Sequence, residues 1–190
     1  MKSNSVPWLL FGVLLVASNL RLPITSIGPV IQNIGTDWQL GSSALGLLTT
    51  LPLLAFALIS PLTPPLAQRF GLNRTLAGCL VLIILGFTGR LLPSLPMLYI
   101  GTALIGAGIA IGNVLLPSLV KAHFPEKIAL ITSVYAFTMG LAAAAGSALV
   151  IPLMQSFAWT WAQALFAFVG LTIISLLVWL PQLKQQAVHT

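Results

Sequence analysis

The sequence predicts an all-α, polytopic membrane protein with six transmembrane helices, and three observations support this. Of its 190 residues 58% are hydrophobic and only 5% are charged, and a mean hydropathy of +1.05 lies far above that of soluble domains. The uncharged stretches 38–68, 91–120 and 128–183 are each longer than the roughly 20 residues that cross a bilayer. They lack the two-residue alternation of barrel strands, so the spans are expected to be helices.

The individual spans follow from the apolar runs and from the breaks between them. The expected helices cover residues 8–34, 43–66, 75–92, 97–119, 128–154 and 160–180. Four short breaks separate them: GTDWQLGS (35–42), AQRFGLNR (67–74), PSLP (93–96) and VKAHFPEK (120–127). The fifth and sixth helices share the run 128–183, whose most polar and aromatic point, QSFAWTW (155–161), is typical of a turn at the lipid headgroups.

Basic residues in the short loops predict the orientation of the bundle, because such residues stay on the cytoplasmic side of a membrane. They all fall on one face: Lys2, Arg69, Arg74, Lys121, Lys127 and Lys184. The opposite face carries one acid, Asp37, and no basic loop residue. We therefore expect a multi-pass protein of the cell inner membrane with both termini in the cytoplasm. The apolar amino-terminal segment continues past signal-peptide length, so we expect it to be retained as the first helix.

The polar residues do not form an enzyme or metal site. Asp37 and Glu126 are expected in loops on opposite faces, so they cannot act as a carboxylate pair. Cys79 and two scattered histidines, His123 and His189, do not provide a zinc ligand set, and a single cysteine cannot form an internal disulfide. No cofactor is expected. The net charge of +6 follows from the topology, so nucleic acid is not expected as a partner.

Arg21 is set into the apolar stretch SNLRLPITSIGPVI (18–31). In a continuous first helix it would lie about 20 Å along the axis, near the bilayer centre, where a charge is costly. The same helical face would carry Ser18, Thr25, Gly28 and Gln32. No carboxylate of this sequence is within reach, which leaves two roles for Arg21. Its planar guanidinium recognises an anionic ligand, or it bonds to backbone carbonyls freed by Pro23.

Other polar residues of the spans are weaker candidates for lining the same cavity. They are Thr49, Thr50, Asn113, Tyr135 and Thr138. A hydrogen bond between helices is the alternative role for each of them. Arg90 lies two residues before the expected outer end of the third helix, so its side chain is expected to snorkel to the membrane surface.

Small residues predict where two helices approach closely. They are Gly101, Gly108 and Gly112 in the fourth helix, and Gly140, Ala144 and Ala148 in the fifth. Because such spacings let helix backbones touch, both faces are expected to be packing surfaces, with the fifth helix offering a partner to the fourth. The alternative is that these smooth faces let helices slide or rock.

Three stretches together resemble the cyanate and 2-nitroimidazole transporter family of the major facilitator superfamily. They are SNLRLPITSIGPVI (18–31), LLTTLPLLAFALISPL (47–62) with LAQRFG (66–71), and GIAIGNVLLPSLVK (108–121). The resemblance implies a secondary transporter for a small anion or weak acid, working by alternating access between two six-helix halves. It also implies that the first and fourth helices line a central cavity. The substrate-binding candidates are then Arg21, Ser18, Thr25, Asn113 and Tyr135.

The loop LAQRFGLNR (66–74) resembles the conserved cytoplasmic motif of the superfamily and is the candidate gating loop. It keeps Arg69, Gly71 and Arg74 but has Gln68 where the family usually carries aspartate. Thr102 stands near the position of an arginine common in proton-coupled members.

Length is the largest difference from the family pattern, because a facilitator has about twelve helices and this sequence predicts six. The sequence thus resembles the amino-terminal half of a transporter. We expect either a half that works with a second six-helix half or with a copy of itself, or a truncated half without transport activity of its own.

Overall fold

The computed structural model describes residues 5–184, and every regular element in this range is helical. Six segments are long and apolar enough to cross a membrane: Pro7–Trp38, Ser42–Phe70, Leu72–Leu91, Leu95–His123, Pro125–Phe157 and Trp161–Leu183. The prediction of an all-α fold with six spans is therefore confirmed. Lys2 and His189, which the sequence predicts at the cytoplasmic face, lie outside the described residues.

Several spans are built from more than one helical element. The first contains α1 (Ser5–Asn19), α2 (Leu22–Thr25), η1 (Gly28–Val30) and α3 (Ile31–Trp38); the second contains α4 (Ser42–Ile59), η2 (Ser60–Leu62) and α5 (Thr63–Phe70). The third is α6 (Leu72–Leu91), and the fourth is α7 (Leu95–His123). The fifth contains η3 (Pro125–Lys127) and α8 (Ile128–Phe157); the sixth contains α9 (Trp161–Ala167), α10 (Val169–Trp179) and η4 (Leu180–Lys184).

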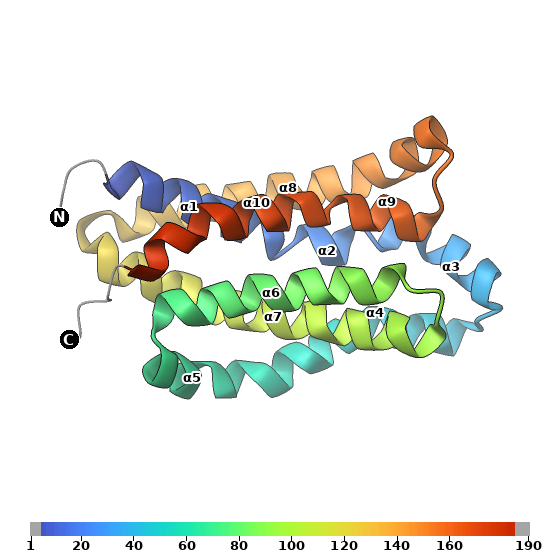
Figure 1. The fold of residues 1–190 in the computed structure, drawn as a ribbon, viewed down its shortest axis with the longest axis horizontal. Coiled ribbons are helices and arrows are strands. Elements are labelled where there is room, and N and C mark those ends of the chain that lie inside the picture. Colours follow the sequence, from blue (N-terminus) through green and yellow to red (C-terminus); the bar gives the residue numbers. More distant parts are fainter. Residues whose placement is uncertain (1–4, 185–190) are drawn as a thin grey trace.

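The spans run up and down one bundle (Figure 1). The start of α1, the corner between α5 and α6, the end of α7 and η4 lie at one end, on the left of the view, while α3 and the α6–α7 and α8–α9 turns lie at the other. α7 packs against α6 and α4, whereas α1 and α2 pack against α8. Because α10 contacts both α1 and α6, it joins these two groups around an apolar core that includes Leu20, Ile83 and Leu116.

Glycines set the close contact between α6 and α7. A methyl group built on Gly108 would lie 2.8 Å from the carbonyl oxygen of Cys79, and one built on Gly101 would collide with the backbone at Gly86. One built on Gly112 would lie 3.2 Å from the sulfur of Cys79, which is itself fully buried. The expected packing role of these α7 glycines is confirmed, and their main partner is the third span.

The small-residue face of the fifth span differs from the expectation. Gly140, Ala144 and Ala148 are exposed in this chain, and a methyl group on Gly140 would meet no atom within 4 Å. Gly146 lies against the first span instead, where a methyl group would be 3.0 Å from the carbonyl oxygen of Leu22. The prediction that the exposed trio forms the packed face was wrong, because a four-residue repeat of small side chains recurs on two faces of this alanine-rich helix.

The first span is not the continuous helix that the sequence predicts. Pro23 and Pro29 lack a backbone N–H, so neither can continue the regular ladder. The chain forms tighter turns instead, with hydrogen bonds to the third residue back. The N–H of Leu20 donates to the oxygen of Ala17 at 3.1 Å, and that of Ile27 donates to the oxygen of Ile24 at 3.4 Å. The helical faces of α1 and α2 are therefore out of register with the single polar stripe expected from an unbroken helix.

Burial is uneven among the spans. The second and fifth bury the smallest share of their residues inside the described chain, and they expose large apolar side chains such as Leu58, Leu53, Leu130 and Phe137. An apolar helix surface of this kind is stable against lipid or against another apolar helix. These two spans therefore form the outer surface of this six-helix unit.

Candidate functional site

Arg21 lies at the break between α1 and α2. Its backbone is not helical (φ −121°, ψ −41°), and its carbonyl oxygen accepts the N–H groups of Ile24 and Thr25 at 3.2 and 3.1 Å, which starts α2. The side chain is exposed on the surface of this unit. The proline-broken segment thus presents a guanidinium part-way along the first span without burying it within these six helices.

The other substrate-binding candidates come from three spans. Ser18 is half-buried and donates its hydroxyl to the oxygen of Leu14 at 3.0 Å, and half-buried Asn113 donates its side-chain nitrogen to the oxygen of Ile109 at 2.9 Å. Tyr135 is buried on α8. The one hydroxyl proton of Ser18 is therefore used within its own helix, whereas the amide nitrogen of Asn113 has two N–H groups and keeps one of them to offer a ligand.

Thr25 ties the first span to the fifth. Its hydroxyl lies 3.0 Å from the carbonyl oxygen of Ala143, and the hydroxyl of Ser147 donates to the carbonyl oxygen of Thr25 at 3.1 Å. The close approach of the two backbones at Gly146 permits both bonds. The structure thus gives Thr25 a helix-to-helix contact, a role that the sequence did not predict for this residue.

Arg90 is the one buried cation among the residues whose burial the structure describes, and the prediction that it snorkels to the membrane surface was wrong. Its side chain is 1% exposed; Nε donates to the hydroxyl oxygen of Thr102 at 3.1 Å, and Nη1 donates to the carbonyl oxygen of Pro23 at 3.0 Å. In a regular helix the N–H of Ile27 would occupy that carbonyl. Because this N–H bonds to Ile24 instead, the break in the first span supplies an acceptor that draws Arg90 inward.

This reassigns one of the two roles expected for Arg21. Bonding to a carbonyl made free at the proline break is done by Arg90, from the third span. The sequence indicates only that the turn at PSLP folds α7 back along α6, so that the start of α7 lies beside the end of α6. The bond to Thr102, six residues after the turn, is seen only in the structure.

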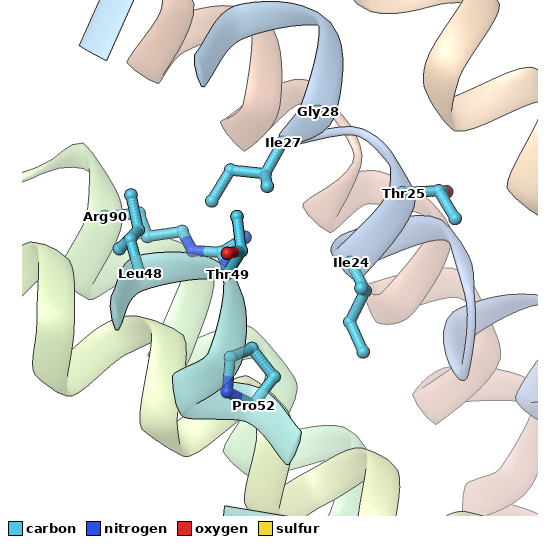
Figure 2. Close-up of a pocket in the computed structure, with 8 residues that line it drawn as sticks. All are labelled: Ile24, Thr25, Ile27, Gly28, Leu48, Thr49, Pro52 and Arg90. Atoms are coloured by element: carbon cyan, nitrogen blue, oxygen red, sulfur yellow. The ribbon is translucent and has the colours of Figure 1, made fainter. Parts of the chain in front are cut away.

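A cavity of about 180 Å³ lies between the first and second spans (Figure 2). Ile24, Ile27 and Gly28 contribute one wall, and Leu48, Thr49 and Pro52 the other, while Arg90 reaches in from α6. Figure 2 shows Ile27 and Thr49 projecting from opposite sides, with the Arg90 side chain extending toward Thr49. Of the five substrate-binding candidates, Thr25 lines this cavity, and its side chain points away from the opposite wall.

A second cavity, of about 270 Å³, opens at the end of the bundle that carries α3 and α9. Asp37, Arg90 and Trp161 are among its lining residues. The indole nitrogen of Trp161 donates to Asp37 Oδ2 at 2.6 Å, which joins the ends of the first and sixth spans. Arg90 therefore borders both cavities.

The candidate gating loop forms a tight corner at the opposite end. α5 ends at Phe70, and Gly71 follows with φ +88° before α6 begins. This backbone conformation favours glycine, which explains the residue at that position. Gln68, Arg69 and Arg74 are exposed around the corner. Within residues 5–184 no group of three or more histidine, cysteine or acidic side chains is placed to hold a metal ion.

Six apolar spans in an all-helical bundle make this chain a polytopic membrane unit, and the family model described as Major Facilitator Superfamily matches residues 9–189. The chain belongs to the major facilitator superfamily. It is 48% identical over 178 residues to a protein of Escherichia coli (strain K12) named 2-nitroimidazole transporter. The aligned residues cover 94% of this chain and 45% of that protein.

Two further relatives show similar coverage. The chain is 46% identical over 179 residues to the "Uncharacterized transporter YycB" of Bacillus subtilis (strain 168), covering 94% of this chain and 44% of the relative. It is 26% identical over 172 residues to the "Cyanate transport protein CynX" of Escherichia coli (strain K12), covering 90% and 44%. The chain thus spans somewhat less than half the length of the curated relatives that it matches.

Proposed function

We propose that this chain provides the first six-helix half of a secondary transporter that moves a small anion or weak acid by alternating access. Membership of the major facilitator superfamily supports the transporter class, and the names of two relatives, which refer to 2-nitroimidazole and to cyanate, support a small acidic cargo. The observation that carries the proposal is the exposed guanidinium of Arg21 on an apolar span.

A charge exposed to hydrocarbon at that depth is unfavourable, so the surface around Arg21 is expected to border water and a second helical unit. A second six-helix half, or a second copy of this chain, would enclose this surface as a cavity. The largely unburied second and fifth spans offer the apolar area for such a contact. In this arrangement Arg21 binds the anion and Asn113 contributes an N–H group from the fourth span. Ser18 and Tyr135 line the site from the first and fifth spans, and Thr25 holds the broken segment in place.

The gating loop is proposed to lie on the cytoplasmic side of the inner membrane, together with both termini. Arg69 and Arg74 are exposed beside the glycine corner at Gly71 and are free to meet the partner half during closure. Gln68 is uncharged, so it cannot form the ion pair that an aspartate at this position could form. Its contact with the partner half would be a hydrogen bond, to a neutral or to a charged group.

The test is uptake by an assembled transporter. The chain is co-expressed with the carboxy-terminal six-helix half of the 48%-identical relative, in cells that lack their own carriers for cyanate and 2-nitroimidazole. We expect accumulation of labelled cyanate or labelled 2-nitroimidazole above cells that express either half alone. Co-assembly of the halves in the membrane without uptake of either compound would refute the proposed cargo class.

A further inference from the structure

The guanidinium of Arg90 is incompletely satisfied. Nε and Nη1 donate to Thr102 and Pro23, but the buried Nη2 has no hydrogen-bond partner within the described part of the chain. Both existing partners are uncharged oxygens, so they do not neutralise the cation. A buried cation of this kind is stabilised strongly by an anion that reaches its free N–H groups.

The cavity beside Arg90 has no competing donor or acid among its lining side chains. The hydroxyl of Thr49 donates to the oxygen of Gly46 at 2.9 Å, and that of Thr25 is directed to Ala143, so neither proton is available. The remaining side chains of the lining are apolar, and none is acidic. Arg90 is thus the one lining side chain with a donor to give.

We propose that this cavity is a binding site for a small organic monoanion, with Arg90 as its anion-binding group, separate from the exposed surface around Arg21. Two N–H groups on Nη2 suit a charged oxygen, while the walls formed by Ile24, Ile27 and Pro52 suit an uncharged remainder. The volume of about 180 Å³ lies below the roughly 300–1,000 Å³ of sites for drug-sized ligands, so the ligand is small. The inference rests on the proposed function in one respect only: the class of ligand, a small anion, is the class of cargo proposed for transport.

Arg90 also borders the second cavity, together with Leu92 and Pro93 at the turn between α6 and α7. The carboxylate of Asp37 lines that cavity and accepts the indole N–H of Trp161. Its negative charge disfavours an anion there, whereas the lining of the cavity between the first and second spans contains no acidic side chain.

Equilibrium binding of labelled benzoate to the purified 190-residue chain in lipid nanodiscs tests this site without a second half. Unlabelled benzoate should displace the label, whereas benzamide, which has the same ring without the charge, should not. Arg90→Gln should weaken binding at least tenfold, because a hydrogen bond to a charged group typically contributes more than the roughly 1.4 kcal/mol that a tenfold change represents. Lys121→Gln, which removes an exposed charge far along α7, is the matched control.

A cavity-filling pair separates ligand binding from a structural role of Arg90. Gly28 lines the cavity and has no positive φ, and an added methyl group there would meet no atom within 4 Å apart from its chain neighbours and the backbone of its own helix. Gly28→Leu should therefore fold and occupy the ligand's space. It should also weaken binding at least tenfold. Gly78→Leu adds the same side chain to an equally open position on α6, outside both cavities, and should leave binding unchanged.

Several results would overturn the site. They are the absence of saturable benzoate binding to the folded chain, equal displacement by benzamide, or unchanged affinity in Gly28→Leu. Should Arg90→Gln fail to fold, Gly28→Leu decides alone. If Arg21→Gln abolishes binding and Gly28→Leu does not, the anion binds at the Arg21 surface, which removes this inference and leaves the proposed transport standing. Conversely, binding at Arg90 without uptake by the co-assembled halves would refute the proposed cargo class for transport and keep the site.

Discussion

At the scale of single residues, Thr102 holds the side chain of Arg90 against α7. Its buried hydroxyl accepts a hydrogen bond from Nε of Arg90 and donates one to the carbonyl oxygen of Leu98 at 2.7 Å. Thr102→Val keeps the shape but leaves Nε without an acceptor, at a cost of about 1–3 kcal/mol. The melting temperature in detergent should fall by several degrees.

Thr88→Val is the control for that measurement, because Thr88 is exposed on α6 and its hydroxyl bonds only to the oxygen of Ile84 in its own helix. Its effect should be within about 0.5 kcal/mol. Equal melting temperatures for the two valine variants would show that the Arg90–Thr102 bond contributes nothing to stability.

Arg21 gives the second prediction at this scale. If it binds the anion, Arg21→Ala should reduce uptake per assembled transporter by at least tenfold, and Arg21→Lys should retain only part of the activity because an ammonium lacks the planar fork. The melting temperature should stay the same, since Arg21 is exposed in this unit. Normal uptake by Arg21→Ala, measured per molecule in the membrane, would exclude it from the binding site.

The sequence identified both intramembrane arginines but not their surroundings. Apolar flanks are enough to mark Arg21 and Arg90 as unusual. The direction of the Arg90 side chain, however, depends on residues from other spans: the carbonyl of Pro23, which does not accept the N–H of Ile27, and the hydroxyl of Thr102 both accept hydrogen bonds from it. Depth counted along one helix carries no information about such acceptors. That is why the expected snorkelling failed, and why the cavity beside Arg90 was not predicted.

At the scale of elements, the α6–α7 contact depends on glycine. A side chain at Gly108 would collide with the backbone oxygen of Cys79 and with Ile83, and backbone cannot yield as a flexible side chain can. Gly108→Leu should therefore force the two helices apart and lower stability by an amount typical of an overpacked core, about 1–3 kcal/mol or more. Thermal melting in detergent measures the loss.

Gly140→Leu on the fifth span is the matched comparison, because a side chain there meets open space in this chain. Its melting temperature should equal that of the unchanged chain. If Gly108→Leu melts at that same temperature as well, the close contact between α6 and α7 does not limit stability.

Hydropathy is sufficient to predict the spans, because a bilayer demands long uninterrupted apolar segments and the loops here are short. It does not reveal how a span is interrupted. The prolines at 23 and 29 were visible in the sequence, yet whether a helix continues past its proline, as α7 does at Pro117, or breaks, as between α1 and α2, depends on what satisfies the freed backbone groups. In the first span, Arg90 satisfies one such group by donating to the carbonyl oxygen of Pro23, although the two residues lie far apart in the sequence.

At the scale of the whole molecule, the alternation of six spans predicts which ends can be labelled from each side. Single cysteines at Ser42 and Pro93 should react with an impermeant maleimide added outside intact cells, and those at Arg74 and Glu126 only after the membrane is opened. All four positions are exposed in the structure. Labelling of Ser42→Cys and Glu126→Cys from the same side would contradict the topology.

The buried position of Cys79 makes that experiment simpler. With no exposed surface and with α7 pressed against it at Gly108 and Gly112, the native thiol is sheltered from aqueous reagents while the bundle stays closed. Introduced cysteines can therefore be read in the natural background, without first replacing the endogenous one. The same shelter makes Cys79 an internal gauge of helix separation: any condition that parts α6 from α7 should appear as a rise in its alkylation rate, observed on a protein that carries no mutation at all.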